Sequence, residues 1–80
     1  MAKPSPSLSG NPTLTAIGKA IRAERVRKGM AQEALAFEAG IDRSYLGGIE
    51  RGEHNVAIIN LLKIANALSV SISELLKGVS

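Results

Sequence analysis

The feature that most restricts the fold is a series of apolar residues at helical spacing, broken at short intervals by glycine or polar residues. The chain has 80 residues, with one Phe, one Tyr and no Trp, so its core has to be built from aliphatic side chains. A chain of this length buries only roughly 60% of its unfolded surface, which leaves room for one core. No segment has the alternating pattern of a strand. The sequence therefore predicts a single all-α domain.

Five helices are expected from this periodicity and from the residues that begin and end helices. Residues 1–12 contain three prolines and are predicted to be a disordered arm, with the domain spanning residues 13–80. Thr13 is expected to cap the first helix, and Gly29 to follow its basic last turn. The remaining helices are expected at residues 32–39, 42–51, 58–68 and 71–79, the last with Ser71 and Glu74 as a capping box.

The composition excludes several classes of function. The chain has no cysteine and a single histidine, so a thiolate or clustered metal site is not expected. It also lacks a glycine-rich phosphate loop and a cluster of acid and base residues, which argues against an enzyme. No cofactor, effector site, signal peptide or membrane span is expected, and a cytoplasmic location is the default. The net charge of +3 suits a polyanionic partner without requiring one.

Residues 31–52, AQEALAFEAGIDRSYLGGIERG, carry the most informative pattern. Ala36 is small enough for two helices to approach, Gly40 permits a sharp turn with positive φ, and Ile41, Leu46 and Ile49 supply buried aliphatic groups. This spacing resembles the helix-turn-helix of the lambda-repressor-like, Xre-type family, over about residues 14–77. The segment IDRSYLGGIERG is most similar to restriction-modification controller proteins.

The resemblance implies a five-helix lambda-repressor-like domain that binds double-stranded DNA as a sequence-specific transcriptional regulator. In that geometry the third helix lies in the major groove and its first residues face the bases. Arg43 is the expected main reader, because an arginine can donate two hydrogen bonds to guanine, and Ser44 can bond to a base or a phosphate. Gly48 occupies a position where many relatives have a polar side chain, so it either brings bare backbone close to the bases or leaves readout to other residues.

The resemblance also implies contacts to the DNA backbone. Gln32 matches a glutamine that binds phosphate in relatives, although an ordinary surface glutamine is the alternative. Tyr45 is expected to contact the sugar-phosphate backbone or a thymine methyl, or else to pack against the second helix. Arg51, His54 and Asn55 lie where relatives meet the backbone, with His54 also expected to be simply solvated.

Arg25 is expected to have a structural role, because it lies on the apolar stripe of the first helix, four residues after Ile21. Glu50 matches the acidic partner of this arginine in the family. The other cations of the first helix remain open between a solvated face and long-range attraction to DNA: they are Lys19, Arg22, Arg27 and Lys28. Ala31 stands where relatives have a capping Ser or Thr, so the second helix is expected to lack a side-chain cap.

A homodimer on a palindromic operator is expected, because one module of this size contacts too few base pairs to select a genomic site. The expected interface is C-terminal and consists of the aliphatic residues Leu75, Leu76 and Val79, together with Ile58 or Ile59. The alternative for these residues is that they close the core of one chain. The alternative function is an antitoxin or another protein-binding Xre-type module.

Overall fold

The computed structural model describes residues 10–79 and contains the five expected helices, without any strand in that range. They are α1 (Pro12–Arg27), α2 (Gln32–Ala39), α3 (Arg43–Glu50), α4 (Ile58–Ala67) and α5 (Ile72–Leu75). The all-α prediction is confirmed, and the bounds of the first four helices agree with expectation to within one residue at most ends. The expected arm lies outside the described residues, apart from residues 10–12.

The start of α1 differs from the prediction. Asn11, not Thr13, is the N-cap, and its side-chain oxygen accepts hydrogen bonds from the backbone N–H groups of Thr13 at 2.9 Å and Leu14 at 3.2 Å. Pro12 occupies the first helical position, where its fixed φ and missing N–H carry no penalty. The expectation of Thr13 as the N-cap is therefore wrong, because the Asn-Pro pair before it is itself a start signal.

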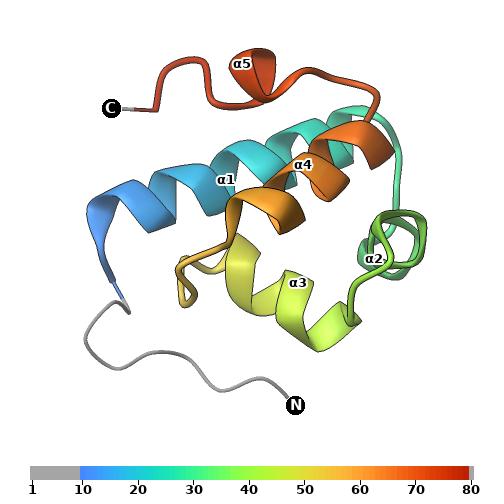
Figure 1. Cartoon of the computed structure of the whole chain (residues 1–80), viewed down its shortest axis with the longest axis horizontal. Helices are drawn as coiled ribbons and strands as arrows, with labels where there is room; N and C mark the ends of the chain where they lie inside the picture. Colours follow the sequence, from blue (N-terminus) through green and yellow to red (C-terminus); the bar gives the residue numbers. More distant parts are fainter. Residues whose placement is uncertain (1–9, 80) are drawn as a thin grey trace.

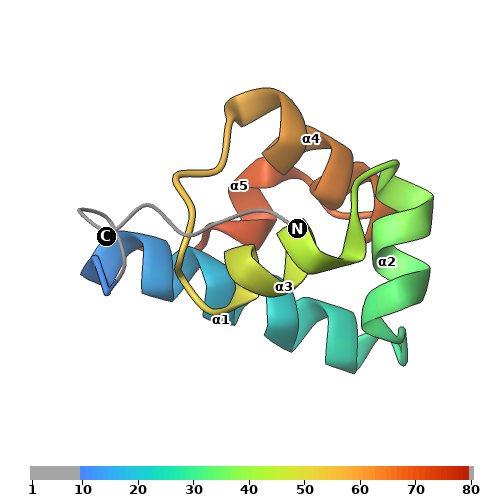
Figure 2. The same cartoon turned by 90° about the horizontal axis from the view of Figure 1, so that it is seen from below.

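The helices enclose one aliphatic core. In Figure 1, α1 and α4 run through the middle of the molecule, with α5 above them, α3 below and α2 at one end. The six largest fully buried side chains among residues 10–79 come from the first four helices or directly follow one of them: they are Ile21, Leu35, Leu46, Ile49, Ile64 and Leu68. Viewed from below, α3 lies in front, beside α1 and next to α2 (Figure 2). This packing leaves Arg43 at the start of α3 exposed and buries residues 46–50 at its end.

The crossing of α1 and α3 depends on Gly18. A Cβ atom built on Gly18 would lie 2.4 Å from the carbonyl oxygen of Ile49 and 2.6 Å from that of Glu50. Both atoms belong to backbone, which cannot move aside as a flexible side chain would. Glycine at this position therefore allows α1 to approach the end of α3 closely, and so sets the orientation of α3.

The turn between α2 and α3 is built as the sequence predicts. Gly40 has φ of 70° and ends α2 in the left-handed conformation, which residues with a side chain rarely adopt. Asp42 then caps α3, its carboxylate accepting a hydrogen bond from the backbone N–H of Tyr45 at 3.3 Å. Two consecutive helices are thus joined through a short, fixed turn, which is the arrangement of a helix-turn-helix.

The C-terminal segment is shorter in helix than expected. Ser71 and Glu74 form the predicted capping box, but α5 ends at Leu75. Val79, expected on the apolar stripe of this helix, lies beyond it in a turn, where its backbone N–H donates to the carbonyl oxygen of Leu76 at 2.9 Å. Gly78, with φ of 89°, stops the helix from continuing to Val79. Over residues 10–79, no helix is both long and apolar enough to cross a membrane.

Candidate nucleic-acid interface

The first turn of α3 presents polar side chains to solvent. Arg43 is the first residue of the helix and is exposed, and Ser44 beside it is half-buried. The Arg43 Nε atom lies 4.0 Å from a carboxylate oxygen of Glu33, a contact between two exposed side chains that contributes little to stability. The guanidinium group therefore keeps its capacity for a bidentate hydrogen bond with another partner.

The second half of α3 is built differently. Gly47 and Gly48 have no side chains, and the side chains of Arg51 and His54 lie over them. A Cβ atom on Gly48 would lie 2.5 Å from the imidazole of His54, and one on Gly47 would lie 3.2 Å from Nη1 of Arg51. Both glycines are buried in the folded chain. A base contact through the bare backbone of Gly48, as the sequence suggested, would require the His54 ring to move away.

His54 and Tyr45 pack together on the side of α3 that faces α4. Their ring centroids are 5.2 Å apart with a tilt of 56°, and His54 is only 9% exposed. The expectation of a solvated histidine is wrong, because the missing side chain of Gly48 leaves a space that the imidazole fills. The Tyr45 hydroxyl accepts a hydrogen bond from the side-chain nitrogen of Asn60 at 3.2 Å, so Tyr45 packs toward α4 and not toward α2.

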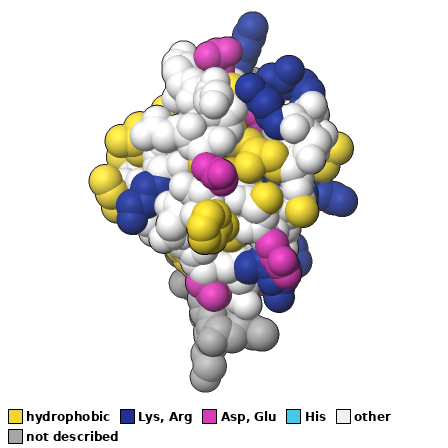
Figure 3. Space-filling model, turned by 90° about the vertical axis from the view of Figure 1, so that its right-hand side faces the viewer, with side chains coloured by type: hydrophobic (Ala, Val, Ile, Leu, Met, Phe, Trp, Pro, Cys, Tyr) yellow, Lys and Arg dark blue, Asp and Glu magenta, His cyan; other side chains and the backbone are white. Residues whose placement is uncertain are grey.

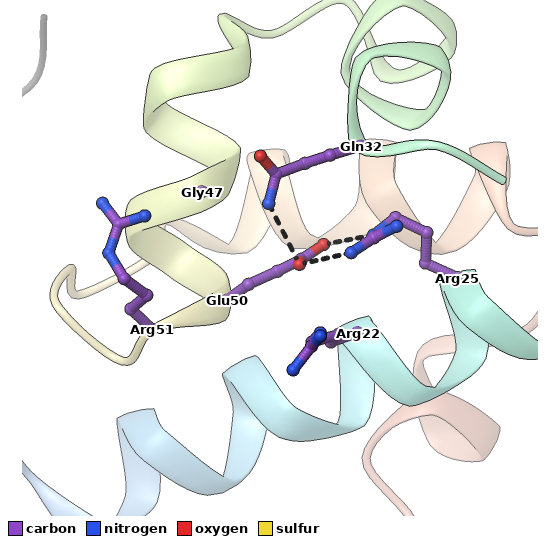
Figure 4. A pocket seen from close by; sticks show the side chains of 6 residues that line it. All are labelled: Arg22, Arg25, Gln32, Gly47, Glu50 and Arg51. Atoms are coloured by element: carbon purple, nitrogen blue, oxygen red, sulfur yellow. Dashed lines mark hydrogen bonds and ion pairs between the residues drawn. The ribbon is translucent and has the colours of Figure 1, made fainter.

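A network of polar side chains joins α1, α2 and α3 (Figure 4). Arg25 donates from Nε and Nη2 to the two carboxylate oxygens of Glu50, at 2.8 and 3.0 Å, and from Nη1 to the carbonyl oxygen of Met30. Glu50 is 4% and Arg25 12% exposed at the side chain, which confirms the predicted ion pair. This hydrogen-bonded carboxylate raises the pKa of Arg25.

Gln32 belongs to the same network. Its side-chain nitrogen donates to Glu50 at 3.1 Å, so it is not an ordinary surface glutamine. The backbone N–H groups of the first turn of α2 have no side-chain cap, because Ala31 precedes them in an extended conformation and offers no acceptor. The missing cap is as the sequence predicts.

A hollow of about 260 Å³ lies beside this network, between α1, α2 and the end of α3. Its lining residues are Arg22, Arg25, Gln32, Gly47, Glu50 and Arg51. Arg51 donates from Nε and Nη2 to the carboxylate of Glu53, at 2.9 and 3.2 Å. These bonds lower the pKa of the Glu53 carboxyl and hold the Arg51 side chain in place. The hollow therefore combines three arginines with one carboxylate that is already fully bonded.

Sequence reasoning left two of these features without a function. Arg22 was open between a solvated and an attracting cation, although it precedes Arg25 by three residues and so shares its side of α1. Gly47 was given no role, and the contribution of Glu53 was missed. Asn55 is exposed in the loop before α4, as expected. Among residues 10–79, no three His, Cys, Asp or Glu side chains are grouped so that they could hold a metal ion.

The predicted dimer residues differ in how exposed they are in the single chain. Leu75 is 4% exposed and belongs to the core of the single chain, so it cannot serve as an exposed contact. Leu76 and Val79 are half-buried, whereas Ile58 is 73% exposed at the start of α4. Two neighbours on the same helix, Ile59 and Leu62, are exposed as well. The exposed apolar surface thus lies on α4 and not on α5.

Other apolar side chains also reach the surface. Figure 3 views the end of the molecule where α2 lies and shows hydrophobic side chains among charged ones. Phe37 of α2 is 86% exposed, and Val26 near the end of α1 is 59% exposed. Neither residue was singled out from the sequence, because helical spacing alone does not say which side of a short helix is covered.

The helix-turn-helix family matches residues 21–75 of the chain, a range that contains α2, α3 and α4 in full. The chain is 45% identical over 60 residues to the control protein C.BamHI of Bacillus amyloliquefaciens, covering 74% of each protein. It spans about half of a longer relative, 53% of a hypothetical transcription factor from Neisseria meningitidis, at 45% identity over 56 residues.

Solved structures of restriction-modification controller proteins have the same fold. C.AhdI from Aeromonas hydrophila superposes with a TM-score of 0.76 at 50% identity, over 78% of this chain and 94% of that one. C.Esp1396I, solved as a tetramer in complex with its natural 35 base-pair operator, gives a TM-score of 0.76 at 37% identity, over 81% of this chain and 86% of that one.

Proposed function

The chain belongs to the helix-turn-helix family, and from this premise we propose that it is a sequence-specific DNA-binding transcriptional regulator of the restriction-modification controller kind. Its similarity to C.BamHI and C.AhdI supports this assignment. C.Esp1396I, of the same fold, was solved on its operator. We expect it to act on double-stranded DNA, without enzymatic activity, in the cytoplasm.

The observation that carries the proposal is the position of Arg43. It is the first residue of α3, its side chain is exposed, and its contact with Glu33 is too long to satisfy it. An arginine at the start of a helix also meets the positive end of the helix dipole, which is unfavourable in the free protein. In the major groove the same guanidinium would bond to guanine O6 and N7.

The remaining contacts would come from residues around this first turn. We propose that Ser44 contacts a base or a phosphate, and that Gln32, Arg51 and Asn55 approach the backbone of the duplex. The Tyr45 hydroxyl, which accepts from Asn60, still has its own hydrogen to donate to a phosphate oxygen. His54 would act indirectly, because its ring packs against Tyr45 and lies over the backbone of Gly48.

Binding to a palindromic operator requires two copies of the chain, and the exposed side of α4 is the proposed interface. Ile58, Ile59 and Leu62 lie on one side of this helix and are between 42% and 73% exposed. A two-fold dimer buries the same surface on both subunits. Leu76 and Val79 remain candidates at its edge, and Leu75 is left out because it belongs to the core of one chain.

Selection from a pool of random duplexes tests the DNA-binding proposal. The duplexes retained by the protein are sequenced after several rounds. We expect an enriched inverted repeat whose half-sites are about 10 base pairs apart, or a multiple of that distance. If no sequence is enriched, the assignment as a regulator is contradicted and a protein-binding module is favoured.

Sedimentation equilibrium tests the interface. Ile59→Glu should shift the protein from dimer to monomer, because a carboxylate cannot be buried unpaired between two copies. Val26→Glu introduces the same charge at a site of equal exposure on α1 and should leave the dimer intact. Equal association of both variants would place the interface elsewhere.

A further inference from the structure

The hollow between α1, α2 and α3 has a charge arrangement that the ion pair inside it does not explain. Both carboxylate oxygens of Glu50 accept from Arg25, and one of them also accepts from Gln32. The Glu50 side chain is 4% exposed, so its charge is compensated and largely hidden from solvent. Two further arginines, Arg22 and Arg51, stand at the edge of the hollow, and the structure gives Glu50 no contact with either.

The guanidinium group of Arg51 is bonded to Glu53 through two of its nitrogen atoms, and the third lies near Gly47 in the hollow. Its Nε and Nη2 atoms donate to Glu53, whereas Nη1 lies 3.2 Å from the point that a Cβ atom of residue 47 would occupy. In Figure 4 the guanidinium of Arg51 lies alongside α3 at Gly47, and Arg22 projects from α1 on another side of the hollow. Glu53 thus orients Arg51 without using all of its donors.

Gly47 keeps the floor of the hollow open. A Cβ atom there would approach Arg51 and also lie 3.4 Å from the side-chain oxygen of Gln32. Gly47 is one helical turn after Arg43, which corresponds to about 5.4 Å along the helix axis. A group held at Gly47 would therefore lie next to the groove that Arg43 is proposed to enter.

We propose that this hollow holds one phosphate of the DNA backbone, with Arg22 and Nη1 of Arg51 as its donors and Gly47 as the space for its oxygens. The inference rests on the proposed function and assigns Arg22 and Gly47 a role in it. Arginine is suited to such a site because its planar group donates two parallel hydrogen bonds to phosphate oxygens. Glu53 is the positioning residue for Arg51.

The first test compares two charge-removing variants, Arg22→Gln and Lys77→Gln, in titrations of a selected duplex at several salt concentrations. Lys77 follows α5, on the opposite side of the molecule from α3 (Figure 1). Arg22→Gln should lower affinity about tenfold and reduce the slope of log affinity against log salt by about 1 per protomer. Lys77→Gln should leave the slope unchanged. Equal slopes for the two variants would overturn the inference.

Ethylation interference identifies the phosphate directly. Ethylation of the contacted phosphate should weaken binding by the wild-type protein more than binding by Arg22→Gln, which retains only the Arg51 donor, at one position in each half-site. Identical interference patterns for both proteins would contradict the site while leaving DNA binding itself intact. Failure of the wild type to bind any duplex would instead remove the proposed function.

Gly47→Ala provides a test that does not remove charge. The methyl group takes up the space at Gly47 between Arg51 and Gln32, while Arg51, as a flexible side chain, can yield by a few tenths of an ångström. Alanine also favours helix more than glycine, so the melting temperature should not fall. We expect weaker DNA binding by a protein at least as stable as wild type. Unchanged affinity in this variant would overturn the role of Gly47.

Discussion

The first turn of α3 and its second half differ in which residues supply their outer surface. Arg43 and Ser44 belong to the helix itself, and their side chains extend from it. At Gly47 and Gly48 the helix contributes only backbone, and Arg51 and His54 from the following loop cover it. A recognition helix can thus be polar at one end through its own sequence and at the other end through residues that fold back onto it.

The two parts also differ in how firmly they are attached. The end of α3 is fixed to α1 by the close approach at Gly18 and by the ion pair of Arg25 with Glu50. The first turn carries its Asp42 cap and the hydrogen bond between Tyr45 and Asn60, and its Arg43 side chain is exposed. The fixed end sets the orientation, and the freer end is available for contact.

Gly18→Ala should have the largest effect, because it disrupts the close contact between α1 and the end of α3. The added methyl group would overlap with two backbone carbonyl oxygens and force α1 away from α3. We expect a loss of about 3 kcal/mol in the free energy of unfolding, measured by urea denaturation. Ala20→Gly, on the same helix, serves as a control and should lose only about 1 kcal/mol through helix propensity. Equal losses for both variants would mean that the crossing tolerates a side chain.

Gly48→Ala should have a smaller effect and tests whether the His54 ring is held in place. Alanine favours helix, but its methyl group would lie 2.5 Å from a ring packed against Tyr45. We expect a net loss of about 1 kcal/mol by thermal denaturation, since overpacking outweighs propensity. A more stable variant would show that His54 leaves its position at no cost, and the distinction between the two halves of α3 would weaken.

Ala31→Ser should have the smallest effect and the opposite sign. Ala31 already has the extended conformation of an N-cap, with φ of −70° and ψ of 154°. A serine hydroxyl there could accept from the first turn of α2 and add about 0.5 to 1 kcal/mol of stability. Ala34→Ser, exposed within α2, should lose a few tenths of a kcal/mol instead. A loss at residue 31 would indicate that this backbone is not free to accept a cap.

Much of the fold could be predicted because its signals are local. Gly40 ends a helix, Asp42 caps the next one, and Ser71 with Glu74 forms a capping box, each within a few residues of chain. The ion pair of Arg25 with Glu50 could be predicted too: an arginine on an apolar stripe needs an acidic partner, and the resemblance to the family identified that partner as Glu50. These inferences required no knowledge of how the helices pack.

The features that sequence reasoning missed depend on packing between distant segments. His54 was expected in solvent because the space above Gly48 exists only once the loop folds back. Leu75 was expected at the surface because the apolar spacing over residues 71–79 does not reveal which members of the stripe meet the core. The exposure of Phe37 has the same origin. Helical spacing identifies a stripe, whereas packing decides which neighbours cover it.

The most direct test of the account is the DNA affinity of wild type and Arg43→Ala for a selected duplex and a scrambled one, measured by fluorescence anisotropy at two salt concentrations. If the first turn of α3 reads sequence, Arg43→Ala loses about 1 to 3 kcal/mol of preference for the selected duplex and keeps most of its affinity for the scrambled one. An equal loss on both duplexes would mean that Arg43 acts only as a cation near the backbone, and it would contradict the central claim.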